Sequence, residues 1–140
     1  MNTKITIEET ILAPISRVWK LFTDSNHIIH WNFAHESWHC PKSVSDFRVG
    51  GSFSNTMSAK DGSFSFDLNG IFDEIVSEKI LKYHLEDGRK VEVQFETIDE
   101  DSTKLIEIFE PENENSHEMQ KQGWSAILAN FKKYVENNRA

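Results

Sequence analysis

The sequence predicts an α+β fold in which a long C-terminal helix packs on a curved antiparallel sheet. Two patterns support this class. Between residues 44 and 109 the chain is a run of short segments in which apolar and polar residues alternate, as in half-buried strands. From residue 116 the apolar positions recur with helical spacing. The sheet has one apolar face and the helix has one apolar stripe. The two must pack together, because either surface alone would be exposed to water.

The N-terminal segment predicts a strand followed by two short helices. Isoleucines alternate with polar residues over 4–11, which is typical of a half-buried strand. Pro14 suits the first turn of a helix, and the apolar residues after it recur with helical spacing. Asp24 or Ser25 can cap a second short helix that extends to about Trp31. We expect an irregular loop over residues 32–41.

Turn residues divide the central segment into antiparallel strands, because Gly, Asp and Ser favour the backbone conformations that turns require. These signals are Gly50-Gly51, Lys60-Asp61-Gly62, Glu78-Lys79, Glu86-Asp87-Gly88-Arg89 and Asp99-Glu100-Asp101-Ser102.

The last helix is expected to begin near Ser116, which can cap it, and to end near Asn138. At 1.5 Å per residue it is roughly 33 Å long. Its apolar positions are Met119, Trp124, Ile127, Leu128, Phe131, Tyr134 and Val135. Those expected to pack on the sheet are Trp124, Ile127, Leu128, Phe131 and Val135.

The composition limits the class of protein. The 140 residues are typical of one domain, so a single domain over 1–140 is expected. The net charge of −8 makes nucleic acid an unlikely partner, because phosphate backbones require Lys and Arg. Cys40 is the only cysteine, which excludes an internal disulfide. The sequence shows no signal peptide and no membrane-spanning segment, so we expect a cytoplasmic protein with no membrane insertion.

Four segments carry a resemblance to a known family: 11–19 (ILAPISRVW), 47–53 (FRVGGSF), 70–75 (GIFDEI) and 122–128 (QGWSAIL). The order of elements resembles the helix-grip fold of the START-like superfamily, also called SRPBCC, to which birch-pollen allergens belong. Within it, the four segments are similar to those of the activator-of-heat-shock-protein-90-ATPase-homologue family. The resemblance implies a cavity between the sheet and the long helix that takes up apolar or amphipathic ligands. The family also includes polyketide cyclases and eukaryotic chaperone activators.

The chain has ten phenylalanines and four tryptophans, and this excess of rings over aliphatic side chains favours a cavity, because large flat side chains leave gaps when they enclose a space. The expected wall residues are Phe53, Met57, Phe66, Phe72, Phe95, Trp124 and Leu128. A solid core would use the same residues, so that alternative stays open. Trp31, Phe33 and Trp38 are expected to form a lid at the opening. Gly123, within the long helix, predicts close approach to the sheet or space for a ligand, unless it is simply exposed.

Catalytic residues are unknown from the sequence, with Glu9 and His84 as candidates. Both fall on strand faces that otherwise look inward. A buried carboxylate and imidazole close together could act as acid and base on a bound carbonyl compound. The alternatives are a structural buried pair or a wrongly assigned face.

Four histidines and a cysteine cluster between His27 and Cys40, and both residue types bind zinc. No second cysteine or matching carboxylate motif accompanies them. We therefore expect no metal and no cofactor, and we expect this segment to form the rim of a pocket or part of the surface.

Three functions follow as hypotheses. The first is binding of a small hydrophobic or amphipathic ligand in the cavity. The second is a cyclase- or dehydratase-like enzyme acting on a polyketide-like or aromatic substrate. The third is an interaction module with a protein partner, such as a chaperone ATPase activator. The sequence identifies neither the ligand nor the oligomeric state.

Overall fold

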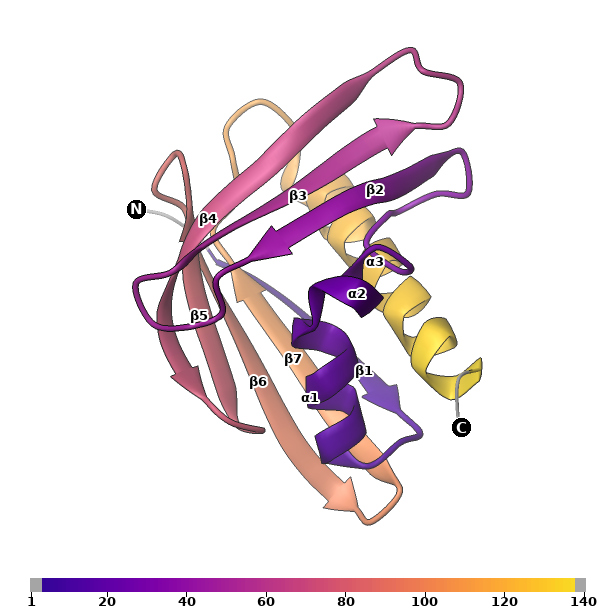
Figure 1. Cartoon of the computed structure of the whole chain (residues 1–140), viewed down its shortest axis with the longest axis vertical. Helices are drawn as coiled ribbons and strands as arrows, with labels where there is room; N and C mark the ends of the chain where they lie inside the picture. The colour runs from indigo at the N-terminus through magenta and orange to yellow at the C-terminus, as the bar shows by residue number, and fades with distance from the viewer. Residues whose placement is uncertain (1–3, 138–140) are drawn as a thin grey trace.

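The computed structural model describes residues 4–137. It contains one seven-stranded antiparallel sheet, two short helices and one long helix (Figure 1). The strands are β1 (Ile5–Ile11), β2 (Trp38–Ser45), β3 (Ser52–Ala59), β4 (Ser65–Val76), β5 (Ile80–Leu85), β6 (Lys90–Asp99) and β7 (Ser102–Phe109). The helices are α1 (Ile15–Thr23), α2 (Ser25–Ile28) and α3 (His117–Asn137).

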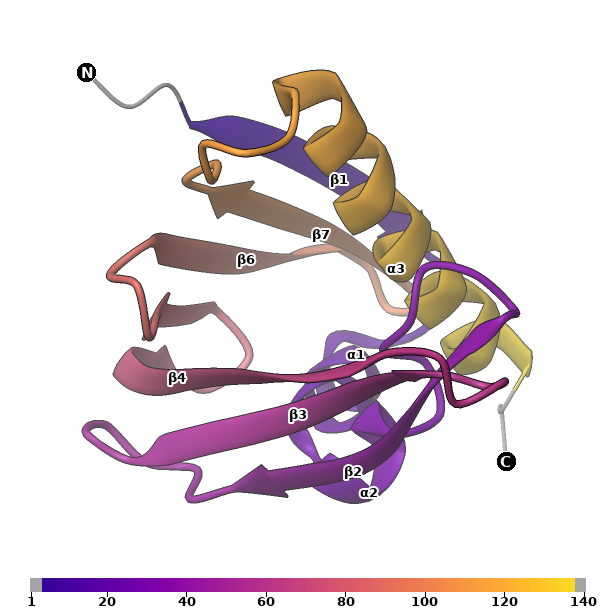
Figure 2. The same cartoon turned by 90° about the horizontal axis from the view of Figure 1, so that it is seen from above.

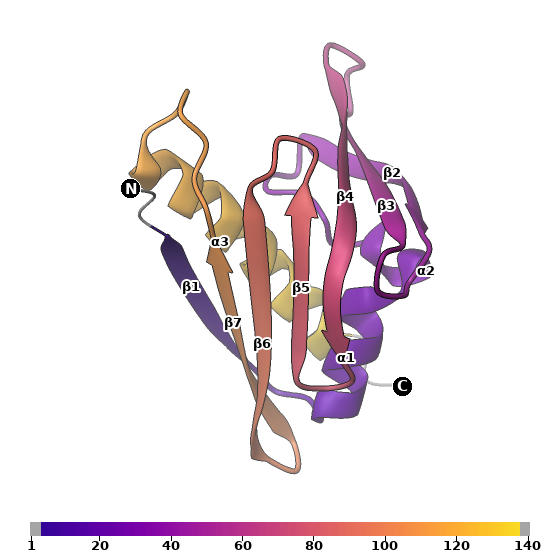
Figure 3. The same ribbon diagram turned by 90° about the vertical axis from the view of Figure 1, so that its left-hand side faces the viewer.

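The strand order is β1-β7-β6-β5-β4-β3-β2, so every pair from β2 to β7 is consecutive in the chain. The N-terminal strand β1 pairs with the last strand, β7, from Ile5 opposite Phe109 to Ile11 opposite Thr103. The sheet curls strongly, so that β1 and β7 lie on one side and β2 and β3 on the other (Figure 2). Helix α3 lies behind the sheet and crosses its strands (Figure 3).

The main core lies where α3 and α1 pack on β1, β6 and β7. Most inward positions of these strands are apolar and buried, in agreement with the alternating pattern. Helix α3 contributes Leu128, Phe131 and Val135, and α1 contributes Val18, Leu21 and Phe22. This confirms the predicted α+β helix-grip fold and the predicted apolar face of the last helix.

The predicted caps of the last two helices agree with the structure, although α2 ends at Ile28 and not near Trp31. Ser116 caps α3, since its hydroxyl accepts a hydrogen bond from the Met119 backbone N–H at 3.1 Å. Asp24 caps α2 by accepting from the Asn26 N–H at 2.9 Å. Helix α3 is described to Asn137, and the predicted end at Asn138 lies outside the described residues.

The loop predicted over 32–41 is wrong in its second half, because β2 begins at Trp38. Pro41 argued against a strand, since it has no N–H to donate to a ladder. Strand β2 is at the edge of the sheet, where a proline is tolerated, and its pairing with β3 shifts register between His39 and Lys42.

Across residues 4–137, no helix combines the length and the apolar character needed to cross a bilayer.

Candidate functional site

A cavity of about 290 Å³ lies between the inner face of the sheet and the helices. Strands β2, β3, β4, β5 and β7 and all three helices contribute to its wall. Most of the lining is apolar, and its aromatic part includes Phe22, Trp31, Phe47, Phe53, Phe72 and Trp124.

Ring contacts hold the aromatic residues against the wall. Trp124 on α3 stacks on Phe109 of β7, with ring centroids 3.9 Å apart and planes 7° from parallel. Phe22 of α1 stacks on Trp31 at 5.2 Å, and the Trp31 indole donates to the Leu21 carbonyl at 3.0 Å. Because these rings are bound to the walls, they do not fill the space between the sheet and α3.

Phe53, on β3, packs against the rings of β4 and β5 in the cavity wall. Its ring centroid lies 5.2 Å from that of Phe72 and 5.1 Å from that of Tyr83. Gly70 on β4 makes this possible, since a Cβ atom there would lie 2.5 Å from the Phe53 ring and 2.7 Å from the His84 carbonyl oxygen. The glycine in the 70–75 segment is therefore required by close packing.

Glu107 places a carboxyl group in this apolar wall. Along β7 the buried inward positions are Thr103, Leu105, Glu107 and Phe109, so the pleat of the strand directs the Glu107 side chain inward. The residue is 8% exposed and lines the cavity. Burial raises the pKa of Glu107 to about 8, because the apolar surroundings disfavour the charged carboxylate.

Tyr83 lines the cavity from β5, the second strand from β7. Burial raises the pKa of its phenol, and the negative charge of an ionised Glu107 raises it further. The Tyr83 hydroxyl therefore remains protonated, and Glu107 holds its proton at neutral pH more strongly than an exposed carboxyl would.

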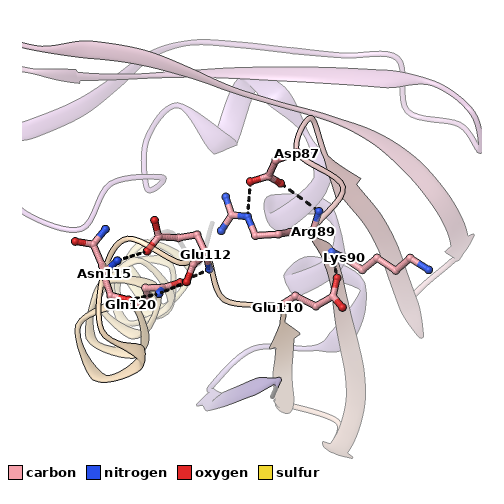
Figure 4. Close-up of polar contacts among 7 residues, drawn as sticks. All are labelled: Asp87, Arg89, Lys90, Glu110, Glu112, Asn115 and Gln120. Carbon is pink, nitrogen blue, oxygen red and sulfur yellow. Dashed lines mark hydrogen bonds and ion pairs between the residues drawn. The ribbon is translucent and has the colours of Figure 1, made fainter. Parts of the chain in front are cut away.

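Other polar groups lie at separate places along the wall. On the β2–β3 side, the Ser43 hydroxyl donates to the Asn55 side-chain oxygen at 2.6 Å. Arg89, beside the β5–β6 turn, also lines the cavity, and its Nε donates to Asp87 at 2.7 Å (Figure 4).

The connector before α3 is tied to the first turns of that helix (Figure 4). The Gln120 side-chain amide accepts from the Glu112 backbone N–H at 2.9 Å and donates to the Asn115 carbonyl at 2.9 Å. Nearby, Glu110 accepts from the Lys90 N–H at 2.6 Å, which links the ends of β7 and β6. These bonds fix the approach of α3 to the sheet.

The structure places most, but not all, of the expected wall residues around the cavity. Those that line it are Phe53, Met57, Phe66, Phe72 and Trp124. Phe95 and Leu128 are instead packed in the core. Phe95 is absent from the wall because Trp19 and Phe22 of α1 cover it.

The expected lid is also wrong. Trp31 is buried in the core and lines the cavity from there together with Asn32, whereas Phe33 and Trp38 do not line it. Trp38 contacts Phe64 and Phe66, at centroid distances of 6.0 and 6.1 Å, on the β3–β4 hairpin.

Gly123 has no atoms within 4 Å of where a Cβ would lie, and it does not line the cavity. Close approach to the sheet therefore does not explain this glycine.

Glu9 and His84 do not form a pair. Glu9 is in phase with the buried isoleucines of β1 and is half-buried. On β5 the cavity is lined by Leu81, Tyr83 and Leu85, so His84 points to the outer face. There its Nδ1 lies 2.9 Å from the Asp73 carboxylate. The inward face assigned to His84 is wrong because the apolar residues on both of its sides define the inner face of the strand.

Three of the histidines between His27 and Cys40 contact other side chains, and two of these share Tyr134. His27 bonds to the Tyr134 hydroxyl at 2.7 Å, His30 stacks on the Tyr134 ring, and His35 bonds to Ser37 at 2.8 Å. Within the described part of the chain, no three His, Cys, Asp or Glu residues lie together as a metal site would need.

Glu107, Tyr83 and Arg89 were not anticipated. A signal for Glu107 was present, because in the sequence it alternates with Leu105 and Phe109 and so shares their buried face. No local pattern indicated that Tyr83 lies within electrostatic reach of it, since the two residues are on different strands.

Comparisons with known proteins agree with this architecture. The sequence model of the family described as Activator of Hsp90 ATPase homolog 1-like protein matches residues 12–136. No protein with a curated description matches the chain.

Solved structures give the same result. An AHSA1-like protein from Aeromonas hydrophila is 40% identical, with a TM-score of 0.90 over 96% of this chain and 93% of that chain. A Cytophaga hutchinsonii protein is 44% identical, with a TM-score of 0.82 over the same shares. The Aha1 dimer from Colwellia psychrerythraea is 14% identical, with a TM-score of 0.76 over 99% of both chains, and shows the fold alone. By its sequence and its fold, this chain belongs to the family of Activator of Hsp90 ATPase homolog 1-like proteins.

Proposed function

We propose that this protein binds a small hydrophobic or amphipathic ligand in the cavity between the sheet and α3. The observation that carries the proposal is the cavity itself, about 290 Å³ in volume, with a mostly apolar lining and a few separated polar groups. Ligand sites in proteins have this composition, and volumes of about 300 Å³ are at the lower end of their range. The size favours a ligand of one or two rings or a short acyl chain.

The surrounding structure supports a binding role. The rings of the wall are held by stacking and edge contacts, so the site is largely formed before a ligand enters. A preformed site loses less conformational entropy on binding than one that must be ordered.

An enzymatic role has less support. The two residues expected to exchange protons, Glu9 and His84, lie on opposite faces of the sheet. A role as a chaperone activator rests on the family description alone.

The proposal predicts that N-phenyl-naphthylamine, an uncharged fluorescent probe, binds the protein with increased emission and quenches tryptophan fluorescence. Trp124→Ala should weaken binding about two- to tenfold, because it removes one aromatic wall of the cavity. Lys60→Ala, on the exposed β3–β4 turn, is the control and should bind as wild type does. Failure of the wild-type protein to bind any uncharged aromatic probe would contradict the proposal.

A further inference from the structure

The cavity wall contains one acidic group that nothing in the described chain satisfies. Glu107 is 8% exposed and lines the cavity between Leu105 and Phe109. Among residues 4–137, none forms a hydrogen bond or ion pair with its carboxyl group, and only burial affects its pKa. Buried polar groups are normally hydrogen-bonded, so a side chain left in this state is suited to a bound group.

The elements around Glu107 offer no opposite charge to hold it ionised. Its strand neighbours are Ile7 on β1 and Val93 on β6. Helices α1, α2 and α3 contribute only uncharged residues to the cavity, and so do β2, β3 and β4. The remaining titratable or charged groups of the lining are Tyr83 and Arg89, and the Arg89 guanidinium is paired with Asp87.

A protonated carboxyl group has one O–H donor and a carbonyl acceptor, and a phenol also donates. Glu107 and Tyr83 therefore present two O–H groups inside an apolar space. These groups suit an uncharged oxygen acceptor. Among the described residues, the lining offers a ligand anion only Arg89, whose guanidinium is already paired with Asp87. A ligand cation would require Glu107 to ionise in surroundings that disfavour its charge.

We infer that Glu107 and Tyr83 form a polar subsite that selects uncharged ligands whose buried end carries a carbonyl oxygen. The Glu107 O–H donates to that oxygen, and the Tyr83 hydroxyl, which lines the same cavity within electrostatic reach of Glu107, is the second donor of the subsite. The rest of the ligand lies against the aromatic wall. This inference rests on the proposed ligand-binding function and specifies the class of ligand.

The test compares two uncharged fluorescent naphthylamines that differ in one group. Prodan is a naphthyl ketone, and its propyl analogue has a methylene in place of the carbonyl. Their dissociation constants are measured by fluorescence for wild type, Glu107→Leu and Glu107→Gln at about pH 6, and thermal melts check that each variant is folded. For each protein, the ratio of the two dissociation constants is compared. A change that a substitution makes to the apolar cavity affects both ligands alike and therefore cancels in this ratio.

Wild type should bind the ketone more tightly than the propyl analogue. The ratio of the two dissociation constants should be about tenfold larger in wild type than in Glu107→Leu, because one buried hydrogen bond contributes about this much. Glu107→Gln should keep the preference, because its amide N–H can donate. As the pH rises through about 8, wild type should lose the preference while Glu107→Gln retains it.

Three outcomes are informative. An equal preference in wild type and Glu107→Leu would overturn the subsite and leave the apolar cavity intact. A ketone preference that rises with pH in wild type would also overturn it, because the ionised carboxylate would then be the binding form. Failure of both compounds to bind wild type would instead contradict the proposed binding function.

Discussion

At the scale of single residues, Glu107 combines an unfavourable environment with a defined position. Its neighbours on the inner face of β7 are Leu105 and Phe109, and no described residue pairs with its carboxyl group. A buried, unpaired carboxyl usually costs stability when it ionises. A buried carboxyl group in a cavity wall is therefore a candidate for ligand binding, because groups with strongly shifted pKa values cluster at functional sites.

This cost predicts how stability depends on pH. The unfolded chain ionises Glu107 near its ordinary pKa of 4.5, whereas the folded protein holds the proton up to about 8. The contribution of Glu107 to stability is therefore fully present below about pH 4.5 and is lost as the pH rises to about 8. Glu107→Gln removes this titration. Relative to wild type, the variant should gain on the order of 4 kcal/mol in unfolding free energy across that range.

Urea unfolding at several pH values measures the difference between Glu107→Gln and wild type. Histidines and surface carboxylates titrate in both proteins and cancel. Glu96→Gln, an exposed position on β6, is the matched control and should show no comparable change. A difference that stays constant between about pH 5 and about pH 8 would contradict the buried, unpaired state of Glu107.

Two glycines should respond in opposite ways to the same substitution. Gly70→Ala should cost about 1–3 kcal/mol, because the added Cβ would overlap the Phe53 ring and the His84 backbone. Gly123→Ala should stabilise the protein by about 0.5–1 kcal/mol, since the helix gains a better helix former and the methyl group meets nothing within 4 Å. Denaturant melts measure both effects, and a destabilised Gly123→Ala would show that the glycine is needed for packing.

At the scale of elements, α3 holds the fold together through its apolar face. Leu128 is 2% exposed and belongs to the cluster in which α3 packs on the sheet. Leu128→Ala should reduce the unfolding free energy by about 2–5 kcal/mol, because it removes buried methyl groups and leaves a cavity. Met119→Ala, on the same helix but 60% exposed, should change it by less than about 0.5 kcal/mol. Denaturant melts of the three proteins decide, and a loss under about 1 kcal/mol for Leu128→Ala would contradict the assigned face.

The strands show where local patterns suffice and where they fail. Strand β1 was predictable because its isoleucines alternate, and the side of the strand that they form is buried while the other side is exposed. The start of β2 was not, because Pro41 resembles a strand breaker. Pro41 is tolerated because β2 is an edge strand, and the order of the strands is a property of the whole sheet.

At the scale of the whole molecule, the curl of the sheet separates the part that forms the core from the part that forms the cavity. One side, formed by β1, β6 and β7, is covered by α1 and α3 and makes the core. The other side, formed by β2, β3 and β4, curves away from α3 and encloses the cavity with it (Figure 2). The same types of residue therefore serve packing at Phe95 and Leu128 and line the cavity at Phe53 and Phe72.

The sequence alone determined the α+β class, the order of the elements, the capped last helix and the apolar face that this helix buries. These features depend on local spacing and on capping chemistry, which act over a few residues. Only the tertiary structure decided which aromatic residues line the cavity, that His84 faces outward to Asp73, and that Glu107 lies in the cavity wall with Tyr83 within its electrostatic reach. Those facts depend on the curl of the sheet and the position of α1, which arise from contacts between residues far apart in the chain.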